Sequence, residues 1–268
     1  SQAVELQSKA AWSLTFPAPT SANGNWTSND GSGSNISGYG IVSLTGLRES
    51  YINITPRADD GISSMPLTVF ASVNNSFTIE MWARTLVPFS TNTLNTESPF
   101  LYCGIPTMQR DSLTISHLNN LAVLTWTSPT EQVCTCTSSA NVITIGAWQH
   151  LAVRITSSFV GRFYVNGQIA CQTSCTFGLS PIANETRCFL GRHANPARAP
   201  HAGSFAAIRV YHSALSSANI AILASEPPPT IPLGLSVSSY GLVPFSTRSI
   251  ISQVTVNDTF YILGGQLT

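Results

Sequence analysis

The sequence predicts an all-β fold, an antiparallel β-sandwich, and three observations carry that prediction. Residues 146–224 hold several short apolar runs that alternate with polar residues, which is the two-residue period of a half-buried strand. Asn166 and Gly167 separate two such runs, and this dipeptide favours a tight hairpin because both turn positions take positive φ. Helical periodicity is nearly absent, since only residues 216–223, with Ser216 as N-cap, predict a short helix.

Strands are expected from the N-terminus onward. Residues 12–16 form the first, and residues 51–55 form the second, which ends at Pro56 because proline cannot donate to a sheet. Residues 21–40 are rich in Gly, Ser and Asn and predict a loop that is too polar to join the core. Residues 77–83 form a strongly patterned third strand. The later strands are expected at residues 100–103, 112–116, 122–127, 132–137, 146–155, 161–170, 189–192 and 205–211. The side chains expected in the core are Trp82, Trp148, Phe163, Val165 and Tyr211.

Composition limits the classes of function. The chain has 268 residues, enough for one large β domain or two smaller ones. Charged residues make up only 9% and the formal net charge is zero, which excludes the electrostatic footprint of a protein that binds nucleic acid or an anionic membrane surface. No run of about eighteen apolar residues occurs, so no membrane span is predicted. The first residue is Ser1 rather than methionine, which a removed secretion signal or a trimmed chain would explain.

Cysteines and N-glycosylation sequons together predict a secreted glycoprotein. The six cysteines form an even set, namely Cys103, Cys134, Cys136, Cys171, Cys175 and Cys188. Six Asn-x-Ser/Thr sequons are present, at Asn25, Asn35, Asn53, Asn74, Asn184 and Asn257. Ser, Thr, Asn and Gln must cover a surface with so few charges, and glycans on the sequons would add to that cover.

All six cysteines are expected to form disulfides, and the sequence alone permits fifteen full pairings. We expect Cys188 to bond Cys171 or Cys175, which are its nearest partners across the intervening loop. Cys134 and Cys136 would point to the same face of a strand and would therefore reach separate partners. A zinc site is disfavoured because one residue separates these two cysteines and no Cys-x-x-Cys motif occurs.

Four segments carry the motifs Ser-Phe-Thr-Ile-Glu-Met-Trp, Trp-Gln-His-Leu-Ala-Val, Phe-Tyr-Val-Asn-Gly and Ile-Arg-Val-Tyr with Ala-Leu-Ser, at residues 76–82, 148–153, 163–167 and 208–216. In this order they resemble the laminin-G-like domains of the concanavalin A-like lectin/glucanase superfamily. The resemblance extends over residues 11–224. It implies a jelly-roll sandwich of two antiparallel sheets, a role in binding or adhesion and, in some members, a calcium ion at the rim.

Neither calcium nor another cofactor is expected in this chain. Ala206 and Ala207 stand before the last core strand, where members of the resembled family carry acidic residues. Calcium takes about six to eight oxygen ligands, several of them from carboxylates. Asp59 and Asp60 are the nearest pair of carboxylates, and their position before Gly61 fits a solvated turn better than a metal site.

A glycoside hydrolase is the weaker alternative, because glucanases belong to the resembled superfamily. Such enzymes need two carboxyl groups about 5–9 Å apart, which acids alternating on one strand would supply. Here Glu80 stands alone between Ile79 and Met81, and Glu131 stands alone at the start of another run. No Gly-x-Ser-x-Gly nucleophile elbow occurs. His150 is expected to be a packed strand histidine rather than a base, and no catalytic residue is predicted.

Residues 191–201 form the candidate ligand-binding loop, called the ligand loop below. The loop gathers two arginines and two histidines from a chain that is poor in charge. Its candidate ligand-binding residues are Arg192, His193, Asn195, Arg198 and His201. Arginine binds carboxylate or sulfate groups bidentately, so the loop suits an anionic ligand. The alternative is a solvated surface loop stiffened by its prolines.

The sandwich domain is expected to cover residues 1–226. Residues 227–232 are rich in proline and predict an extended linker. Residues 233–268 carry strand-like runs at 250–256 and 259–263, but they are too few to form a core of their own.

The C-terminal strands need a partner, because apolar strands left in solvent aggregate. Residues 248–265 resemble the opening of a kelch repeat, which favours a further domain. Docking on the chain's own sandwich is another solution. Residues 233–268 would otherwise add a strand to a neighbouring subunit, and repeated contacts of that kind would build a filament.

The predicted function is that of a secreted glycoprotein binding module that recognises glycans or proteins at a cell surface or in extracellular matrix. Its partner is expected to be a carbohydrate or a cell-surface or matrix protein. The low charge, the paired cysteines, the sequons and the family resemblance all favour this class of function. The alternatives are a structural subunit of an extracellular filament and a glycoside hydrolase.

Overall fold

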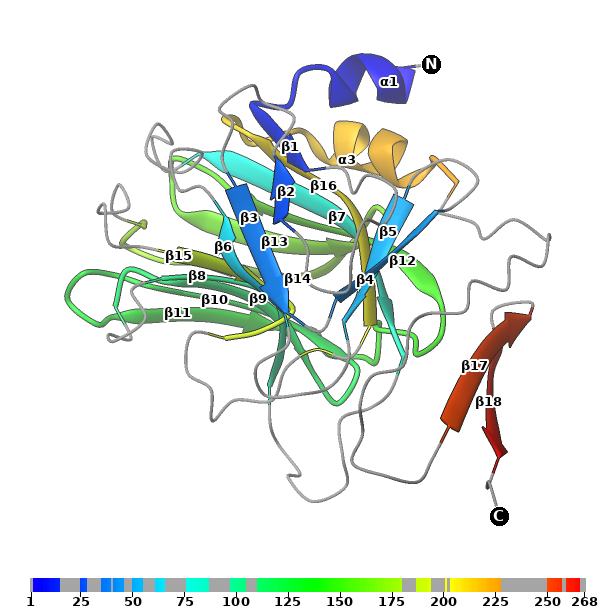
Figure 1. Ribbon diagram of the computed structural model, residues 1–268. Coiled ribbons are helices and arrows are strands. Elements are labelled where there is room, and N and C mark those ends of the chain that lie inside the picture. The colour runs from blue at the N-terminus through cyan, green and yellow to red at the C-terminus, as the bar shows by residue number, and fades with distance from the viewer. Residues whose placement is uncertain are drawn as a thin grey trace. The chain divides into compact units, whose positions relative to one another are not determined.

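The structure is a computed structural model, shown in Figure 1. It describes residues 2–14, 25–27, 35–39, 41–45, 50–54, 61–65, 76–86, 97–104, 110–179, 187–193, 201, 203–227, 250–256 and 259–265. The chain divides into two compact units, Ser1–Pro229 and Thr230–Thr268. The predicted linker at 227–232 spans this boundary, and most of it lies outside the described residues.

Eight strands of the described residues form one sheet, called sheet I. They are β1 (Trp12–Leu14), β4 (Ile41–Thr45), β5 (Ser50–Ile54), β7 (Phe77–Thr85), β12 (Trp148–Ile155), β13 (Val160–Val165), β14 (Gln168–Ser174) and β16 (Gly203–Tyr211). Their order is β14-β13-β12-β7-β16-β5-β4, and β1 also pairs with β16. Every pairing between these strands is antiparallel.

A second sheet, called sheet II, likewise contains eight strands of the described residues. They are β2 (Asn25–Thr27), β3 (Asn35–Tyr39), β6 (Gly61–Met65), β8 (Ser98–Gly104), β9 (Leu113–Leu118), β10 (Leu121–Thr127), β11 (Val133–Thr137) and β15 (Arg187–Leu190). The order is β11-β10-β9-β8-β15-β6-β3-β2, and the pairings are again antiparallel. The predicted antiparallel sandwich is therefore confirmed.

Among the described residues, two short helices accompany the sandwich, α1 (Gln2–Gln7) and α3 (Ser217–Ala224). Figure 1 shows both on the side of sheet I that faces away from sheet II. The predicted helix at 216–223 is confirmed as α3, and the side chain of Ser216 caps it by accepting a hydrogen bond from the backbone N–H of Asn219 at 3.1 Å. Helix α1 has no counterpart among the sequence predictions.

The predicted loop at 21–40 is wrong in part. Strands β2 and β3 lie within it and pair with each other, and β3 also pairs with β6 at the far end of sheet II. Strands β4 and β6 were likewise not expected. These strands are only three to five residues long and include serine, threonine, asparagine and glycine, so each is too short to show a clear two-residue period.

The inward-facing side chains of the two sheets form one core. Alternation along β7 places Phe77, Ile79 and Met81 in this core. Phe163 and Val165 also belong to it, as predicted.

Of the other predicted core residues, two are buried as predicted but outside this cluster, and one is not buried. Trp82 and Tyr211 are buried, but alternation puts them on the outer face of sheet I, where Tyr211 packs under α1 and α3. The prediction that Trp148 lies in the core is wrong. It begins β12 opposite Arg84 on the same outer face, and it is only half-buried, with the guanidinium carbon 6.0 Å from its ring centroid.

The Asn-Gly hairpin between β13 and β14 is confirmed. Asn166 and Gly167 have φ values of 50° and 77°, the left-handed conformation that such a tight turn requires. Asn166 also joins the neighbouring β12, because its Oδ1 accepts from the N–H of His150 at 2.9 Å and its own N–H donates to the carbonyl of His150 at 2.7 Å. The turn therefore fixes the end of three adjacent strands.

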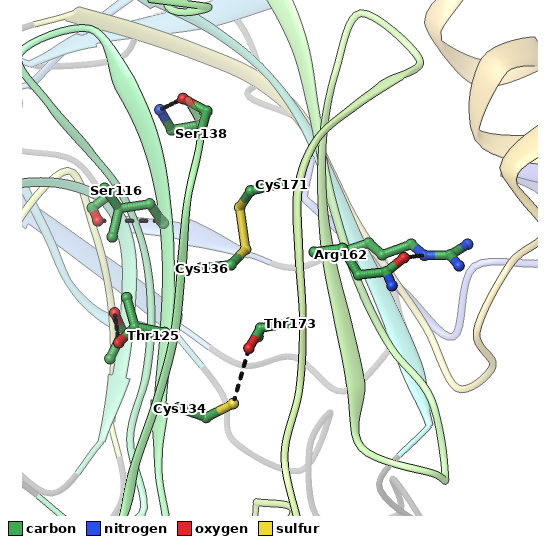
Figure 2. Close-up of a disulfide and its surroundings, with 12 residues drawn as sticks. Ser116, Thr125, Cys134, Cys136, Ser138, Arg162, Cys171 and Thr173 are labelled. Atoms are coloured by element: carbon green, nitrogen blue, oxygen red, sulfur yellow. Dashed lines mark hydrogen bonds between the residues drawn. A yellow bond between two sulfur atoms is a disulfide. The ribbon is translucent and has the colours of Figure 1, made fainter. Parts of the chain in front are cut away.

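Two of the three disulfides join the sheets along one open side of the sandwich. Cys136 of β11 bonds Cys171 of β14, and Cys134 of β11 bonds Cys175, which follows β14. Because β11 and β14 are the end strands of sheet II and sheet I, these bonds staple the two sheet edges together. Figure 2 shows the Cys136–Cys171 bond spanning the strands. As expected, Cys134 and Cys136 point to one face and reach separate partners.

The predicted partner of Cys188 is wrong. Cys188 of β15 bonds Cys103 of β8, directly opposite it in the sheet II ladder, rather than Cys171 or Cys175. The sequence separation of 85 residues hid this pair, because the prediction relied on nearness along the chain.

The C-terminal unit contains a two-stranded antiparallel sheet, β17 (Ile250–Val256) and β18 (Thr259–Gly265). A two-stranded hairpin alone is at best marginally stable in water, so the expectation that this segment needs a partner keeps its physical basis. Pairing with a neighbouring subunit stays a prediction. The kelch-like resemblance is not confirmed.

The Cys136–Cys171 disulfide between the two sheet edges gives a stability prediction. Replacing Cys136 and Cys171 together by alanine should lower the free energy of unfolding by about 2–4 kcal/mol, because the unfolded chain, still closed by the enclosing Cys134–Cys175 bond, regains the conformational freedom that the second cross-link removes. Urea unfolding without reductant measures this change. The variant T135A/T137A, altered at two exposed positions of the same strand, should stay within about 0.5 kcal/mol of the wild type. Equal unfolding midpoints for all three proteins would contradict the prediction.

Candidate functional site

The ligand loop begins and ends on strands of the sandwich. The backbone N–H of His201 donates to the carbonyl of Gly191 at 2.7 Å, and the N–H of Gly191 donates to the carbonyl of Phe100 on β8 at 2.9 Å. The two ends of the loop therefore meet beside β8. Arg192 and His193 lie at one end and His201 at the other, while Asn195 and Arg198 lie outside the described residues.

His193 and Arg192 lie against two aromatic rings of sheet II. Tyr102 of β8 and Phe189 of β15 are opposite one another in the ladder, with ring centroids 6.2 Å apart. The ring centroid of His193 is 3.9 Å from that of Tyr102, and the guanidinium carbon of Arg192 is 5.4 Å from the ring centroid of Phe189. These four residues are called the aromatic cluster. It lies on the outer face of sheet II, because Cys103 beside Tyr102 faces the core.

The side chains of the aromatic cluster differ in how much of their surface is exposed. Tyr102, Phe189 and His193 are 2%, 6% and 8% exposed, whereas Arg192 is half-buried. Arg192 is therefore the described member of the predicted ligand set that is partly accessible. A guanidinium held over a ring keeps its fork of donors in a fixed plane, which suits a carboxylate or sulfate.

A row of threonines continues from the aromatic cluster across the same face. Thr114 of β9 lies opposite Tyr102, Thr125 of β10 lies opposite Thr114, and Thr135 of β11 lies opposite Thr125. The hydroxyls of Thr125 and Thr135 are 3.1 Å apart and hydrogen-bonded. Thr114 is buried, Thr125 half-buried and Thr135 exposed, so this threonine row leads from the cluster to solvent.

Sequence reasoning missed both the rings and the threonine row. Alternation within 112–116, 122–127 and 132–137 assigns the threonines to one face of each strand, but it does not tell which strands are neighbours. The sequence therefore indicated which face of each strand carries the threonines, but not that the three strands together form one surface.

His201 is fully buried rather than at the surface. Its ring centroid lies 4.7 Å from that of Phe100 and 5.0 Å from that of Phe205. A side chain with no exposed area does not reach a ligand on the outer face. The His201 ring instead packs in the core at the base of the ligand loop. Whether the five predicted residues of the loop bind a ligand stays a prediction.

A second polar cluster surrounds Glu80 on the outer face of sheet I. Its Oε2 lies 2.5 Å from Nε2 of His150, and its Oε1 accepts from Arg209 at 3.2 Å and from the hydroxyl of Tyr211 at 3.0 Å. Glu80 is 2% exposed and His150 is 0% exposed. These partners are basic or hydroxyl groups rather than the second carboxyl group that a glycoside hydrolase would need, and the prediction that His150 packs within the sheet agrees with its burial.

Electrostatics keep Glu80 ionised despite its burial. Desolvation would raise the pKa of the carboxyl, but the hydrogen bond from His150, the charges of His150 and Arg209 and the hydroxyl of Tyr211 outweigh it and hold the pKa below its ordinary value. The same carboxylate, together with burial, raises the pKa of Tyr211. The cluster is buried, and its hydrogen bonds join β7, β12 and β16. Its role is therefore to stabilise the pairing of these three strands.

Within the described ranges, no group of three or more His, Cys, Asp or Glu side chains is placed to hold a metal ion. Asp59 and Asp60 lie outside those ranges. The helices of the described residues are too short or too polar to cross a membrane.

The Glu80 cluster gives a second stability prediction. Glu80→Gln should lower the free energy of unfolding at pH 7 by about 3 kcal/mol, because the buried guanidinium of Arg209 would lose the carboxylate that it contacts on β7. Urea unfolding measures the loss. The matched variant Glu131→Gln, at an exposed acid, should change stability by less than about 0.5 kcal/mol.

The pH dependence of stability in the Glu80→Gln variant tests whether the charge of the carboxylate, rather than the shape of the side chain, stabilises the fold. The pKa of Glu80 is lower in the folded protein than its ordinary value of 4.5, so the carboxylate stabilises the fold above that pH and the contribution is lost as the pH falls through the folded pKa. Glu80→Gln should lack this acid-dependent loss. A variant with wild-type stability at pH 7 would contradict the assigned ion pair.

The fold has known relatives. The chain is similar to the receptor-binding domain of botulinum neurotoxin type G, with a TM-score of 0.61 and 14% identity over 81% of this chain and 51% of that one. It thus spans about half the length of that domain. It is similar to the CBM40 domain of the Ruminococcus gnavus IT-sialidase, bound to α2,3-sialyllactose, with a TM-score of 0.52 and 14% identity over 69% of this chain and 98% of that one.

Domain 4 of AbnA, an extracellular GH43 arabinanase from Geobacillus stearothermophilus in complex with arabinotriose, is also similar. Its TM-score is 0.56, with 17% identity over 81% of this chain and 98% of that one. No curated protein matches the chain. A family model described as the concanavalin A-like lectin/glucanases superfamily matches residues 56–221. Since that match covers more than half of the chain, the protein belongs to the concanavalin A-like lectin/glucanases superfamily, as its motifs indicated.

Proposed function

We propose that this protein is a secreted glycoprotein binding module that recognises acidic glycans, or proteins that carry them, at a cell surface or in extracellular matrix. The observation that carries the proposal is the continuity of the aromatic cluster and the threonine row on one face of sheet II. No catalytic step is assigned to this face.

The ligand class follows from the groups that the face offers. Arg192 supplies a fixed cation, which pairs with a carboxylate or sulfate through two parallel hydrogen bonds. Thr125 and Thr135 supply hydroxyls that donate to and accept from sugar hydroxyls. Asn195 and Arg198, predicted from the sequence, would extend the same polar surface. Two of the similar structures hold a sialyllactose and an arabinotriose, which supports a saccharide ligand for this fold.

The extracellular assignment rests on covalent chemistry. All six cysteines are paired in the structure, and disulfides of this kind form and persist in oxidising compartments. The six sequons and the low content of charged residues favour the same location.

Replacing Arg192 tests the ligand class. Arg192→Ala should weaken binding of sialyllactose or sulfated lactose by about ten- to a hundredfold, the range expected for the loss of a hydrogen bond to a charged group. Uncharged lactose should lose less than about twofold. Isothermal titration calorimetry on the folded variant measures these affinities.

The matched controls test the location of the site. Arg162→Ala removes a half-buried arginine from the outer face of sheet I, where it contacts Gln172, and should leave binding unchanged. Thr125→Val tests the threonine row and should weaken binding of all three sugars by about two- to tenfold. Wild-type affinity for the acidic sugars in the Arg192→Ala variant, or no binding of any of them to the wild type, would refute the proposal.

Glycosylation tests the compartment. Peptide mapping of protein expressed in a eukaryotic secretory host, before and after glycosidase treatment, should show glycans on most of the six sequons, because sequons exposed during secretion are modified. Unmodified Asn53 and Asn184 would weaken the extracellular assignment. Cytosolic expression of the same chain supplies the unglycosylated reference mass.

A further inference from the structure

Two histidines meet inside the sandwich at the base of the ligand loop. His117 of β9 and His201, which precedes β16, are 5% and 0% exposed, and their ring centroids lie 5.5 Å apart. The ring of Phe100 packs against both, 5.1 Å from His117 and 4.7 Å from His201. Neither ring nitrogen of His117 has a hydrogen-bond partner among the described residues. The pair therefore occupies an apolar part of the core in which a neutral ring is stable and a charged ring is not.

The position of His201 links this pair to the proposed binding face. Its backbone N–H donates to Gly191, whose own N–H donates to Phe100, and Gly191 immediately precedes Arg192. Displacing the His201 ring from the core would break this chain of hydrogen bonds. Loss of these bonds would release the backbone next to Arg192, the residue proposed to hold the anionic group of the ligand.

No charge among the described residues compensates a proton on either ring. The charged or titratable groups of the surrounding elements lie on the outer faces of the sheets: Glu80, Arg84 and Arg209 on sheet I, and Glu97, Arg192 and His193 on sheet II. Burial accordingly lowers the pKa of His117 to about 4. Burial also lowers the pKa of His201 well below 6.5, and the nearby His117 adds to that shift while the backbone of Arg84 opposes it.

We propose that His201 is a positioning residue for the binding face, and that protonation of His117 and His201 expels the His201 ring and releases the ligand in acid. The proposal rests on the proposed function for the identity of the ligand. Two imidazolium cations at this separation repel one another in a medium that screens them poorly. Because both rings take up protons more readily once exposed to water, the population of the opened form rises as the pH falls below about 6.5.

The opening movement belongs to His201 rather than to His117. His117 stands within β9, which is paired on both sides, with β8 and with β10. His201 lies on a connection before β16, where its backbone N–H donates to Gly191 and its ring lies at the backbone of Arg84. Moving His117 would break two ladders of sheet II, whereas moving His201 disrupts only the base of the ligand loop.

The test measures opening without a ligand and binding with one. Amide hydrogen exchange, corrected for intrinsic rates, reports protection at Gly191 and His201 from about pH 7 to about pH 4.5. Both amides should lose protection by about tenfold or more in the wild type. Amides of the central strand β12 should keep theirs. Over the same range, affinity for sulfated lactose, whose charge stays constant, should fall by about tenfold or more.

The variant His117→Phe removes one titrating ring and keeps an aromatic side chain against Phe100; His117→Leu replaces it if the larger ring prevents folding. Either should reduce both acid effects by about threefold or more, because one of the two rings that take up a proton is absent while His201, whose pKa is lowered mainly by its own burial, still titrates. Constant protection in the wild type, or equal loss at β12 that marks global unfolding, would overturn the inference. If no sugar binds at neutral pH, the proposed function fails, while the exchange data still decide the acid-driven opening.

Discussion

The buried carboxylate of Glu80 is the interaction on which sheet I depends. It lies on β7 and is bonded by His150 from β12 on one side and by Arg209 and Tyr211 from β16 on the other. An ionised carboxylate loses much hydration energy on burial, and a complete set of donors is needed to offset that loss. Three adjacent strands are thereby held in the one register that brings every donor to the same oxygen pair. Breaking this register would leave a buried charge without partners.

The bulge in β16 follows from this requirement. Two residues of β16, Ala207 and Ile208, occupy the ladder between the pairs that Trp82 and Glu80 form, and Ala207 has a φ of 51°. The extra residue reverses the alternation, so that Phe205 and Ile208 both face the core. Without it, Arg209 and Tyr211 would point into the apolar interior rather than toward Glu80. The same bulge leaves Phe205 in contact with His201, which connects the centre of sheet I with the base of the ligand loop.

Local patterns in the sequence predicted local structure well, and distant pairs poorly. The alternation of β7 and the Asn166–Gly167 turn are fixed by neighbours in the chain, so a single sequence reveals them. The partners Glu80 and His150 are separated by 70 residues, and no alternation pattern states which strands lie side by side. For the same reason the ligand loop was recognisable by its composition, whereas the burial of His201 and the rings beneath Arg192 were not.

The arrangement of the two faces supports the placement of the proposed binding surface on sheet II. On sheet I, α1 and α3 cover Tyr211 and Tyr164, and the Glu80 cluster uses the polar groups of the central strands for internal bonds. On sheet II, Thr125 and Thr135 retain access to solvent. Covalent bonds make this surface rigid: Cys103–Cys188 joins the two strands that carry Tyr102 and Phe189, and the edge disulfides fix β11. A surface ordered before binding loses little entropy when a flexible saccharide settles on it, so affinity depends on the few polar groups it presents.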